Sequence, residues 1–187
     1  MRMGIPKAVL HIRGVTFLDN LCASLAGGGC EPVLAVVGDA APAIRAGCRL
    51  TGVELVTNPD PARGQISSLW CALDAVPDVD GLIVVLVDQG GLEPNTIRVV
   101  CEGLEQKPIA VARYRGLAGH PTGFRRVVFE ELRSSPVGQA GARFLVDAAA
   151  AADRVAWVDV RDPGVVRNLN RPEDLVQAGA AFPVEKP

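Results

Sequence analysis

The sequence is poor in the residues that several large protein classes need in number. Only three of its 19 basic residues are lysines, the basic residues form no long run, and the net charge at pH 7 is -2. A protein that binds nucleic acid through charge alone carries a basic surface, so this composition argues against a non-specific nucleic-acid binder. An acidic or phosphate-bearing ligand would therefore need a local site.

Long apolar segments are also lacking. No apolar run approaches the length of a membrane span, and the N-terminal residues MRMGIPK lack the apolar centre of a signal peptide. We therefore expect a cytoplasmic protein without a membrane partner.

The five cysteines are an odd number without paired metal-type spacing, which favours a packing role for them as small apolar side chains.

The 187 residues, 49% hydrophobic and 21% charged, have the composition of one globular domain with a sizeable core. Residues Leu82 to Val87 form a continuous apolar run, which is typical of a strand buried on both faces by helices. The run stops at Asp88, and open α/β sheets place their ligands at such strand ends. Asp88 is therefore the first candidate functional residue, although a capping or turn aspartate explains the pattern equally well.

Strand and helix patterns alternate along the rest of the chain, which predicts one α/β domain over residues 1–187. Strands are expected at 32–38, 53–57, 108–114 and 155–160, and helices at 16–26, 40–46, 64–76, 94–104, 127–132, 140–151 and from 170 onward. Thr16 is expected to cap the first helix, and Ser67 or Ser68 the third. We also expect a loop at 115–119, and we expect Phe144, Leu145 and Ala148 on one side of the helix at 140–151.

A nucleotide site needs a cation for phosphate, a carboxylate for a metal ion and backbone donors from a Gly-rich turn. Lys7 follows Gly4-Ile5-Pro6, and a compact ammonium on a Pro-stiffened turn suits a phosphate oxygen. A lysine near a terminus is more often simply solvated. On the residues alone, both interpretations of Lys7 stay open.

The order of several short motifs resembles one enzyme family. Arg2-Met3-Gly4-x-Pro6-Lys7 is similar to the second half of the signature L-A-A-G-x-S-x-R-M-G-x-P-K of the molybdenum cofactor nucleotidyltransferases, and the closest resemblance is to the cytidylyltransferase branch. The later motifs follow in the family's order: Asn58 with Gly64-x-x-Ser67-Ser68-Leu69, Asp88-Gln89, Gly119-His120-Pro121, Gly138-Gln139-Ala140-Gly141-Ala142-Arg143 and Asn168-Leu169-Asn170-Arg171-Pro172-Glu173-Asp174.

The resemblance implies a Rossmann-like three-layer domain with a mostly parallel mixed sheet, of the kind found in GT-A and nucleotidyltransferase folds. It implies transfer of a nucleoside monophosphate from a nucleoside triphosphate, CTP in the closest branch, to a phosphate acceptor such as molybdopterin. The acceptor oxygen attacks the α-phosphorus and pyrophosphate leaves, so no protein nucleophile is needed. A molybdoenzyme is a further expected partner.

The site residues carried over by the resemblance fall into three groups. Lys7 and Asp88 would carry the chemistry, the first on the triphosphate and the second on Mg²⁺, with Asn170 as the other metal ligand. The nucleotide would be lined by Arg2, Gly4, Lys7, Asn58, Gly64 and Ser68. His120 and Arg143 would lie on the acceptor side, where His120 either acts on the acceptor or fixes its loop, and Arg143 binds either an acceptor phosphate or a surface carboxylate.

Three differences from the family favour a second hypothesis. The strand and the L-A-A-G-x-S half of the signature do not precede Arg2, position 90 is Gly where the family has Pro, and Asn170 stands where the family has an aspartate. Asn170 and the missing half of the signature favour a non-catalytic relative that binds nucleotide or cofactor and assists the maturation of a molybdoenzyme, whereas Lys7 with Asp88 favours the enzyme. A third hypothesis is a nucleotidyltransferase for a sugar phosphate or another small acceptor.

Two structural expectations follow. Lys7 and Asp88 should face the same cleft, within about 15 Å of each other. Because the first strand of such folds is central, the sequence as given should be unable to complete a continuous sheet, and backbone donors and apolar faces should be left unpaired. We therefore expect that further residues precede Met1 in nature or have been left out of the sequence.

Overall fold

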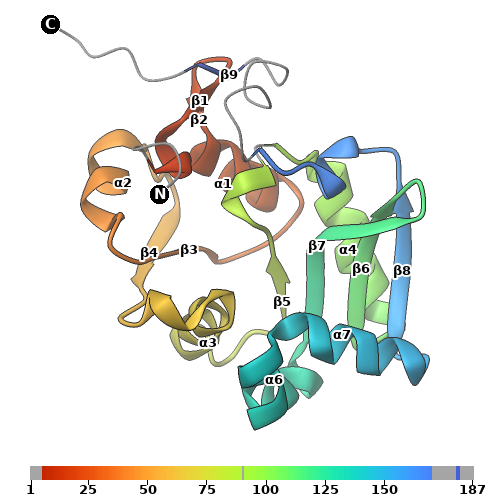
Figure 1. The fold of residues 1–187 in the computed structure, drawn as a ribbon. Coiled ribbons are helices and arrows are strands. Elements are labelled where there is room, and N and C mark those ends of the chain that lie inside the picture. Colours follow the sequence, from red (N-terminus) through yellow and green to blue (C-terminus); the bar gives the residue numbers. More distant parts are fainter. Residues whose placement is uncertain (1–5, 90, 170–179, 182–187) are drawn as a thin grey trace, which may run out of the picture.

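The computed structural model describes residues 6–89, 91–169 and 180–181, which form α-helices, short 3-10 helices and strands (Figure 1). The α-helices are α1 (Phe17–Gly27), α2 (Ala41–Gly47), α3 (Gln65–Ala75), α4 (Pro94–Gln106), α5 (Phe129–Arg133), α6 (Ser135–Ala140) and α7 (Ala142–Ala151). The strands are β1 (His11–Ile12), β2 (Val15–Thr16), β3 (Val33–Val37), β4 (Val53–Thr57), β5 (Gly81–Val84), β6 (Ile109–Tyr114), β7 (Leu117–Arg125), β8 (Val155–Val160) and β9 (Ala180–Ala181). The 3-10 helices are η1 (Lys7–Val9), η2 (Pro61–Arg63), η3 (Val87–Gln89), η4 (Arg126–Val128) and η5 (Pro163–Val166). No described helix combines the length and the apolar character that crossing a membrane requires.

The strands confirm the mixed α/β class but not a single sheet. Four strands pair in the order β5-β7-β6-β8, with β6 parallel to β8 and β7 antiparallel to both of its neighbours (Figure 1). Strands β3 and β4 form a separate parallel pair. Among the described residues no backbone ladder joins β3 to β5. The sheet is therefore divided, as expected from the sequence.

Helices cover both faces of the four-stranded sheet, and strand β6 shows how the core is divided. Ile109 and Val111 point into a cluster formed with α3, α5 and α7. Ala110 and Ala112, which alternate with them, belong to a second cluster formed with α1 and α4. Because successive side chains of a strand point to opposite faces, one strand serves both cores and the domain has three layers.

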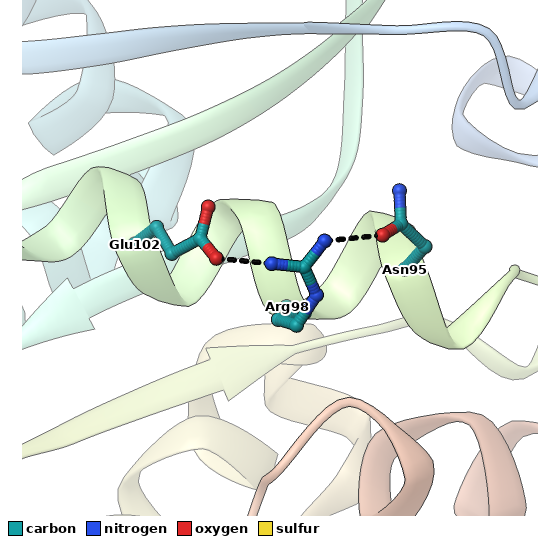
Figure 2. A network of polar contacts seen from close by, with 3 residues as sticks. All are labelled: Asn95, Arg98 and Glu102. Atoms are coloured by element: carbon teal, nitrogen blue, oxygen red, sulfur yellow. Dashed lines mark hydrogen bonds and ion pairs between the residues drawn. The ribbon is translucent and has the colours of Figure 1, made fainter.

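Helix α4 illustrates how apolar burial, rather than surface charge, holds a covering helix in place. Its inner face carries Ile97 and Val100, both fully buried. On its outer face Arg98 donates a hydrogen bond to Asn95 at 2.6 Å and pairs with Glu102 (Figure 2). Exposed ion pairs contribute about 0–1 kcal/mol, whereas each buried aliphatic side chain contributes about 1.5–3 kcal/mol.

The start of α1 is capped as predicted. The hydroxyl oxygen of Thr16 accepts a hydrogen bond from the Asp19 amide at 3.1 Å. The Asp19 carboxylate in turn accepts hydrogen bonds from the amides of Arg49 and Leu50, at 3.0 and 2.9 Å. This carboxylate therefore ties the first helix to the segment that leads into β4.

Four of the five cysteines take up the packing role that was predicted for all of them. All five are free thiols, and Cys22, Cys30, Cys48 and Cys101 belong to or pack against the apolar clusters. Burial raises the pKa of Cys22 to about 11, so this thiol stays protonated at neutral pH.

Several predicted boundaries were wrong. Strand β5 ends at Val84 instead of Val87, because its register with β7 ends at the pair Val84 and Thr122 and the next residue of β7, Pro121, has no N–H to donate. The expected loop at 115–119 is mostly the start of β7, because residues from Leu117 onward pair with β6. Tertiary pairing decided both outcomes.

Two helix predictions were also wrong. The N-cap of α3 is Gly64, whose φ of 87° suits glycine, so Ser67 and Ser68 lie inside the helix. In α7 the buried residues are Leu145, Val146 and Ala149, while Phe144 is 47% exposed. The terminal helix predicted from residue 170 onward lies outside the described residues.

Candidate functional site

The predicted meeting of Lys7 and Asp88 is confirmed. Lys7 begins η1 near the N-terminus, and Asp88 lies in η3 just beyond β5. The Lys7 Nζ is 3.8 Å from Asp88 Oδ2, and each side chain is about a quarter exposed. Both residues line a cavity of about 2230 Å³, which places an ammonium and a carboxylate side by side in one opening.

The second carboxylate oxygen of Asp88 lacks a hydrogen-bond partner among the described residues. Asp88 Oδ1 is buried, and no hydrogen bond reaches it from the described residues. A buried carboxylate oxygen is costly unless a donor or a cation compensates its charge. Carboxylate oxygens are also the ligands that Mg²⁺ and Mn²⁺ prefer, so this oxygen fits a divalent cation.

The described residues alone offer few further metal ligands. Among residues 6–89, 91–169 and 180–181 there is no group of three or more His, Cys, Asp or Glu side chains placed to hold a metal ion. Mg²⁺ is often bound by one or two carboxylates, water and the phosphates of a substrate. The arrangement at Asp88 therefore suits a cation that arrives together with a phosphate ligand.

Gln89 fixes the loop that carries Asp88, a task that sequence reasoning missed. Its side chain is 2% exposed; its amide oxygen accepts a hydrogen bond from the Leu86 amide at 3.1 Å, and its Nε2 donates one to the Val165 carbonyl at 3.1 Å. The sequence did show Gln89 within a motif. Only the tertiary structure shows that it anchors the loop to η5.

The C-terminal segment approaches the same loop. The Leu169 amide donates a hydrogen bond to the Asp88 carbonyl at 2.7 Å. Leu169 is the residue before Asn170, the predicted second metal ligand. Asn170 itself, like the predicted nucleotide-binding residues Arg2 and Gly4, lies outside the described residues.

His120 lies in the wall of the same cavity, on β7. Burial lowers the pKa of its imidazole, and the negative charge of Asp88 acts in the opposite direction. The His120 carbonyl is 3.5 Å from Gln89 Nε2, so its backbone belongs to the frame that holds the Asp88 loop.

Two of the predicted nucleotide-side residues, Asn58 and Ser68, are joined by a hydrogen bond. Asn58 is 4% exposed, and its Nδ2 donates to the hydroxyls of Ser67 and Ser68 at 2.9 and 3.0 Å. Its Oδ1 accepts a hydrogen bond from the Asp60 amide at 2.9 Å. Gly64 and Ser68 line the cavity, whereas Asn58 is absent from the described residues that do so. The geometry thus gives Asn58 the task of shaping the loop between β4 and α3.

Arg143 makes the surface contact that was one of its two predicted roles. Its side chain is 74% exposed and pairs with Asp147 one helical turn later, at 2.7 Å. Arg143 also lines the cavity, next to Gln139 and Gly141. A role toward an acceptor phosphate stays a prediction.

The chain is a three-layer α/β protein in which an ammonium and a carboxylate meet in one cavity beyond the end of β5. This pair suits a phosphate-bearing ligand that binds together with a cation. Residues 1–155 match the family described as the MobA-like NTP transferase domain, which is most of the chain. The chain therefore belongs to the MobA-like NTP transferase family.

One curated protein and two solved structures are similar to most of the chain. The chain is 31% identical over 145 residues to nicotine blue oxidoreductase from Paenarthrobacter nicotinovorans, covering 74% of this chain and 71% of the relative. The crystal structure of Rv0371c from Mycobacterium tuberculosis H37Rv superposes with a TM-score of 0.79 at 29% identity, covering 95% and 90% of the two chains. A manganese complex of Rv0371c is similar as well, with a TM-score of 0.76 at 28% identity, covering 93% and 91% of the two chains.

Proposed function

We propose that this protein transfers a nucleoside monophosphate from a nucleoside triphosphate to a phosphate acceptor and releases pyrophosphate. The observation that carries the proposal is the 3.8 Å pair of Lys7 and Asp88 in one cavity, with Asp88 Oδ1 buried and without a hydrogen bond from the described residues. Membership of an NTP transferase family supports the same reaction class.

In this proposal Asp88 holds Mg²⁺, together with Asn170 and oxygens of the triphosphate. The bound metal would neutralise phosphate charge and keep the reacting groups in line. Lys7 lies where it can balance the charge that develops on the departing pyrophosphate. Gln89 keeps the Asp88 loop in place, so that the carboxylate needs little reorganisation during the reaction.

The other predicted site residues are assigned either to the nucleotide side or to the acceptor side of the cavity. Arg2, Gly4, Gly64 and Ser68 are assigned to the nucleotide side, with Asn58 holding the loop. His120 and Arg143 are assigned to the acceptor side. The motif order favours CTP as donor and molybdopterin as acceptor in the cytoplasm, with a molybdoenzyme as the protein that receives the product.

The decisive experiment is a pyrophosphate-release assay with each of the four common nucleoside triphosphates and Mg²⁺, with and without molybdopterin. We expect release only when both substrates are present, and fastest with CTP. Asp88→Asn should reduce turnover by at least about 100-fold, because it removes the charge that holds the metal. Asp153→Asn is the matched control, since Asp153 also pairs with a lysine, Lys107, but at an exposed site outside the cavity.

A second candidate is the non-catalytic binding protein, which Asn170 favours because a neutral amide is a weaker metal ligand than a carboxylate. In that case CTP or molybdopterin would bind to the chain without any release of pyrophosphate.

A third candidate rests on the name of the relative from P. nicotinovorans. Bleaching of nicotine blue by the chain and a chemical reductant, without any transferase activity, would favour an oxidoreductase instead.

A further inference from the structure

The turn that ends helix α1 holds Cys30 in a fixed position. Gly29 has a φ of 93°, the left-handed conformation that suits glycine, and the chain leaves the helix there in a Schellman motif. The Gly29 amide donates a hydrogen bond to the Ala26 carbonyl and the Cys30 amide donates one to the Leu25 carbonyl, both at 3.0 Å. The Cys30 side chain packs against the apolar cluster that contains Leu25. The backbone of Cys30 is therefore fixed by the end of the helix.

Helix α4 brings Cys101 to the same place. A Cβ atom at Gly28 would collide with Ile97 and would lie 3.0 Å from the Pro94 carbonyl oxygen, so the end of α1 packs directly on α4. Ile97 and Cys101 are four residues apart and therefore share one face of the helix. Cys30, two residues beyond Gly28, meets Cys101 there, and the two side chains are joined by a hydrogen bond. The fold thus brings two thiols into contact.

Small solutes can reach both thiols. Cys30 and Cys101 are each partly exposed, and both line the cavity that contains Lys7 and Asp88. Both side chains also pack against the same apolar cluster, which holds the two helices together. A reagent as small as a peroxide can therefore meet this thiol pair in the folded protein.

The hydrogen bond makes the two thiols chemically unequal. Accepting it from Cys30 lowers the pKa of Cys101; burial opposes this effect, and the net pKa lies below the usual value of a thiol. For Cys30 the hydrogen bond to Cys101 raises the pKa, and burial raises it further. The thiolate is the nucleophilic form of cysteine, so Cys101 is the nucleophile of the pair and Cys30 its protonated neighbour.

We propose that Cys30 and Cys101 are a site of reversible oxidation, at which a hydroperoxide converts the two thiols into a disulfide. With hydrogen peroxide, the Cys101 thiolate attacks one oxygen, an S–O bond forms and the O–O bond breaks. The hydroxide that leaves takes up the proton that Cys101 had released, and a sulfenic acid remains on Cys101.

Cys30 completes the reaction. Its sulfur attacks the Cys101 sulfur, the S–S bond forms, the S–O bond breaks, and the Cys30 proton leaves with the hydroxyl group as water. In sum the two thiols lose two electrons and two protons, and hydrogen peroxide becomes two molecules of water. The disulfide would tie the end of α1 to the middle of α4. The proposal does not depend on the proposed transferase reaction.

Oxidation of the reduced full chain with one equivalent of hydrogen peroxide tests the proposal. A chromogenic thiol reagent, added after unfolding, should detect the loss of two of the five free thiols, and dithiothreitol should restore both. Trypsin releases Cys30 on the peptide 14–45 and Cys101 on the peptide 99–113. We expect these two peptides to be joined in a non-reduced digest, with a mass two hydrogen atoms below the sum of the separate peptides.

Single substitutions separate the roles of the two thiols. Cys101→Ser should slow the loss of thiols by at least about tenfold, because the nucleophile is missing. Cys30→Ser should still react at Cys101, since a serine hydroxyl can donate the same hydrogen bond, but the product should be a sulfenic acid that dimedone traps.

Two further variants are controls. Cys48→Ser is the matched control, because Cys48 is also partly exposed but lies outside the cavity lining; it should lose two of its four remaining thiols. Cys22→Ser should keep the joined peptides, which shows that Cys30, and not Cys22 on the same peptide, forms the bond.

Four outcomes would overturn the proposal: unchanged thiols at one equivalent of peroxide, joined peptides that contain another cysteine in place of Cys30 or Cys101, oxidation of Cys101→Ser as fast as that of the unmodified chain, and disulfide-linked dimers in place of the internal bond. The peptide analysis uses the unmodified chain, so it decides the point even if a variant fails to fold. None of these measurements involves nucleotide transfer, so failure here is separate from failure of the proposed function.

Discussion

Lys7 Nζ lies 3.8 Å from Asp88 Oδ2, although three α-helices separate the two residues in the chain. Each residue reaches the cavity from a short 3-10 helix, η1 for the lysine and η3 for the acid. Neither residue needs the other for local structure, so their meeting is a property of the fold. Four predictions about this site and its frame follow from the geometry.

The first prediction concerns the charge of Lys7. Lys7→Gln should lower kcat/KM for the triphosphate by about 10- to 100-fold, because a hydrogen bond to a charged group contributes roughly 1.5–3 kcal/mol. Steady-state pyrophosphate release measures the effect. Lys107→Gln is the control, because Lys107 pairs with Asp153 at 2.8 Å outside the cavity. Equal activity of the two variants would mean that Lys7 does not meet the triphosphate.

The second prediction concerns the metal and Asn170. Two unit charges about 4 Å apart interact by roughly 4 kcal/mol at an effective dielectric near 20, before desolvation is subtracted. Asn170→Asp should therefore tighten Mg²⁺ binding in the absence of nucleotide by at least about tenfold, while the unmodified chain should need the triphosphate to bind the ion well.

Isothermal titration of Mg²⁺ into the free protein decides this point, with Asp88→Asn as the variant that should lose binding. The bond from the Leu169 amide to the Asp88 carbonyl is the structural reason for testing the neighbouring residue. Micromolar binding in the unmodified chain, unaltered in Asn170→Asp, would show that residue 170 is not a ligand.

The third prediction concerns the hydrogen bonds that the Asn58 side chain makes between β4 and α3. Asn58→Ala removes hydrogen bonds to the Ser67 and Ser68 hydroxyls and to the Asp60 amide. Leaving buried polar groups without partners costs about 1–3 kcal/mol, so the free energy of unfolding should fall by that amount. Urea denaturation gives the value. Asn95→Ala, at the exposed site of Figure 2, should change it by less than about 0.5 kcal/mol.

The fourth prediction is a pH dependence of stability set by Asp19. Burial raises the pKa of this carboxyl, but hydrogen bonds from the Arg49 and Leu50 amides and the Thr16 hydroxyl lower it, and the net pKa lies below its usual 3.8. A carboxyl with a lowered pKa in the folded state stabilises the protein above the unfolded value and loses this effect as pH falls through the folded value.

Asp19→Asn should therefore lower the urea midpoint clearly at pH 7, and the difference from the unmodified chain should shrink below about pH 4. Asp39→Asn, at an exposed carboxylate, is the control and should show no such trend. A difference between Asp19→Asn and the unmodified chain that stays constant down to pH 3 would mean that the capping hydrogen bonds, and not the charge, carry the effect.

Patterns within a few residues predicted much of the secondary structure. The strand at 53–57 is confirmed to the residue, and Thr16 caps the first helix as expected. Pro94 begins α4, and the apolar run before Asp88 indicated the strand that leads to the site. Such features depend on side-chain periodicity, capping hydroxyls and the fixed φ of proline, which all act over a turn or two of chain.

Several contacts between distant segments were not predicted from the sequence. The end of β5 at Val84 depends on where Pro121 falls in the facing strand, and the exposure of Phe144 depends on which face of α7 meets the sheet. Gln89 stood in a recognised motif, yet its bond to the Val165 carbonyl follows only from the path of the chain. Local propensities are too weak to settle such choices, because packing against other elements outweighs them.

The sequence by itself determined the alternation of strands and helices, the α/β class and the acid at the end of an apolar strand. Only the tertiary structure decided that Lys7 Nζ lies 3.8 Å from one oxygen of that acid, and that Asp88 Oδ1 has no hydrogen bond from the described residues. The physical reason is that hydrogen-bond satisfaction and ion pairing depend on which groups the folded chain brings within a few ångströms, whatever their separation in sequence.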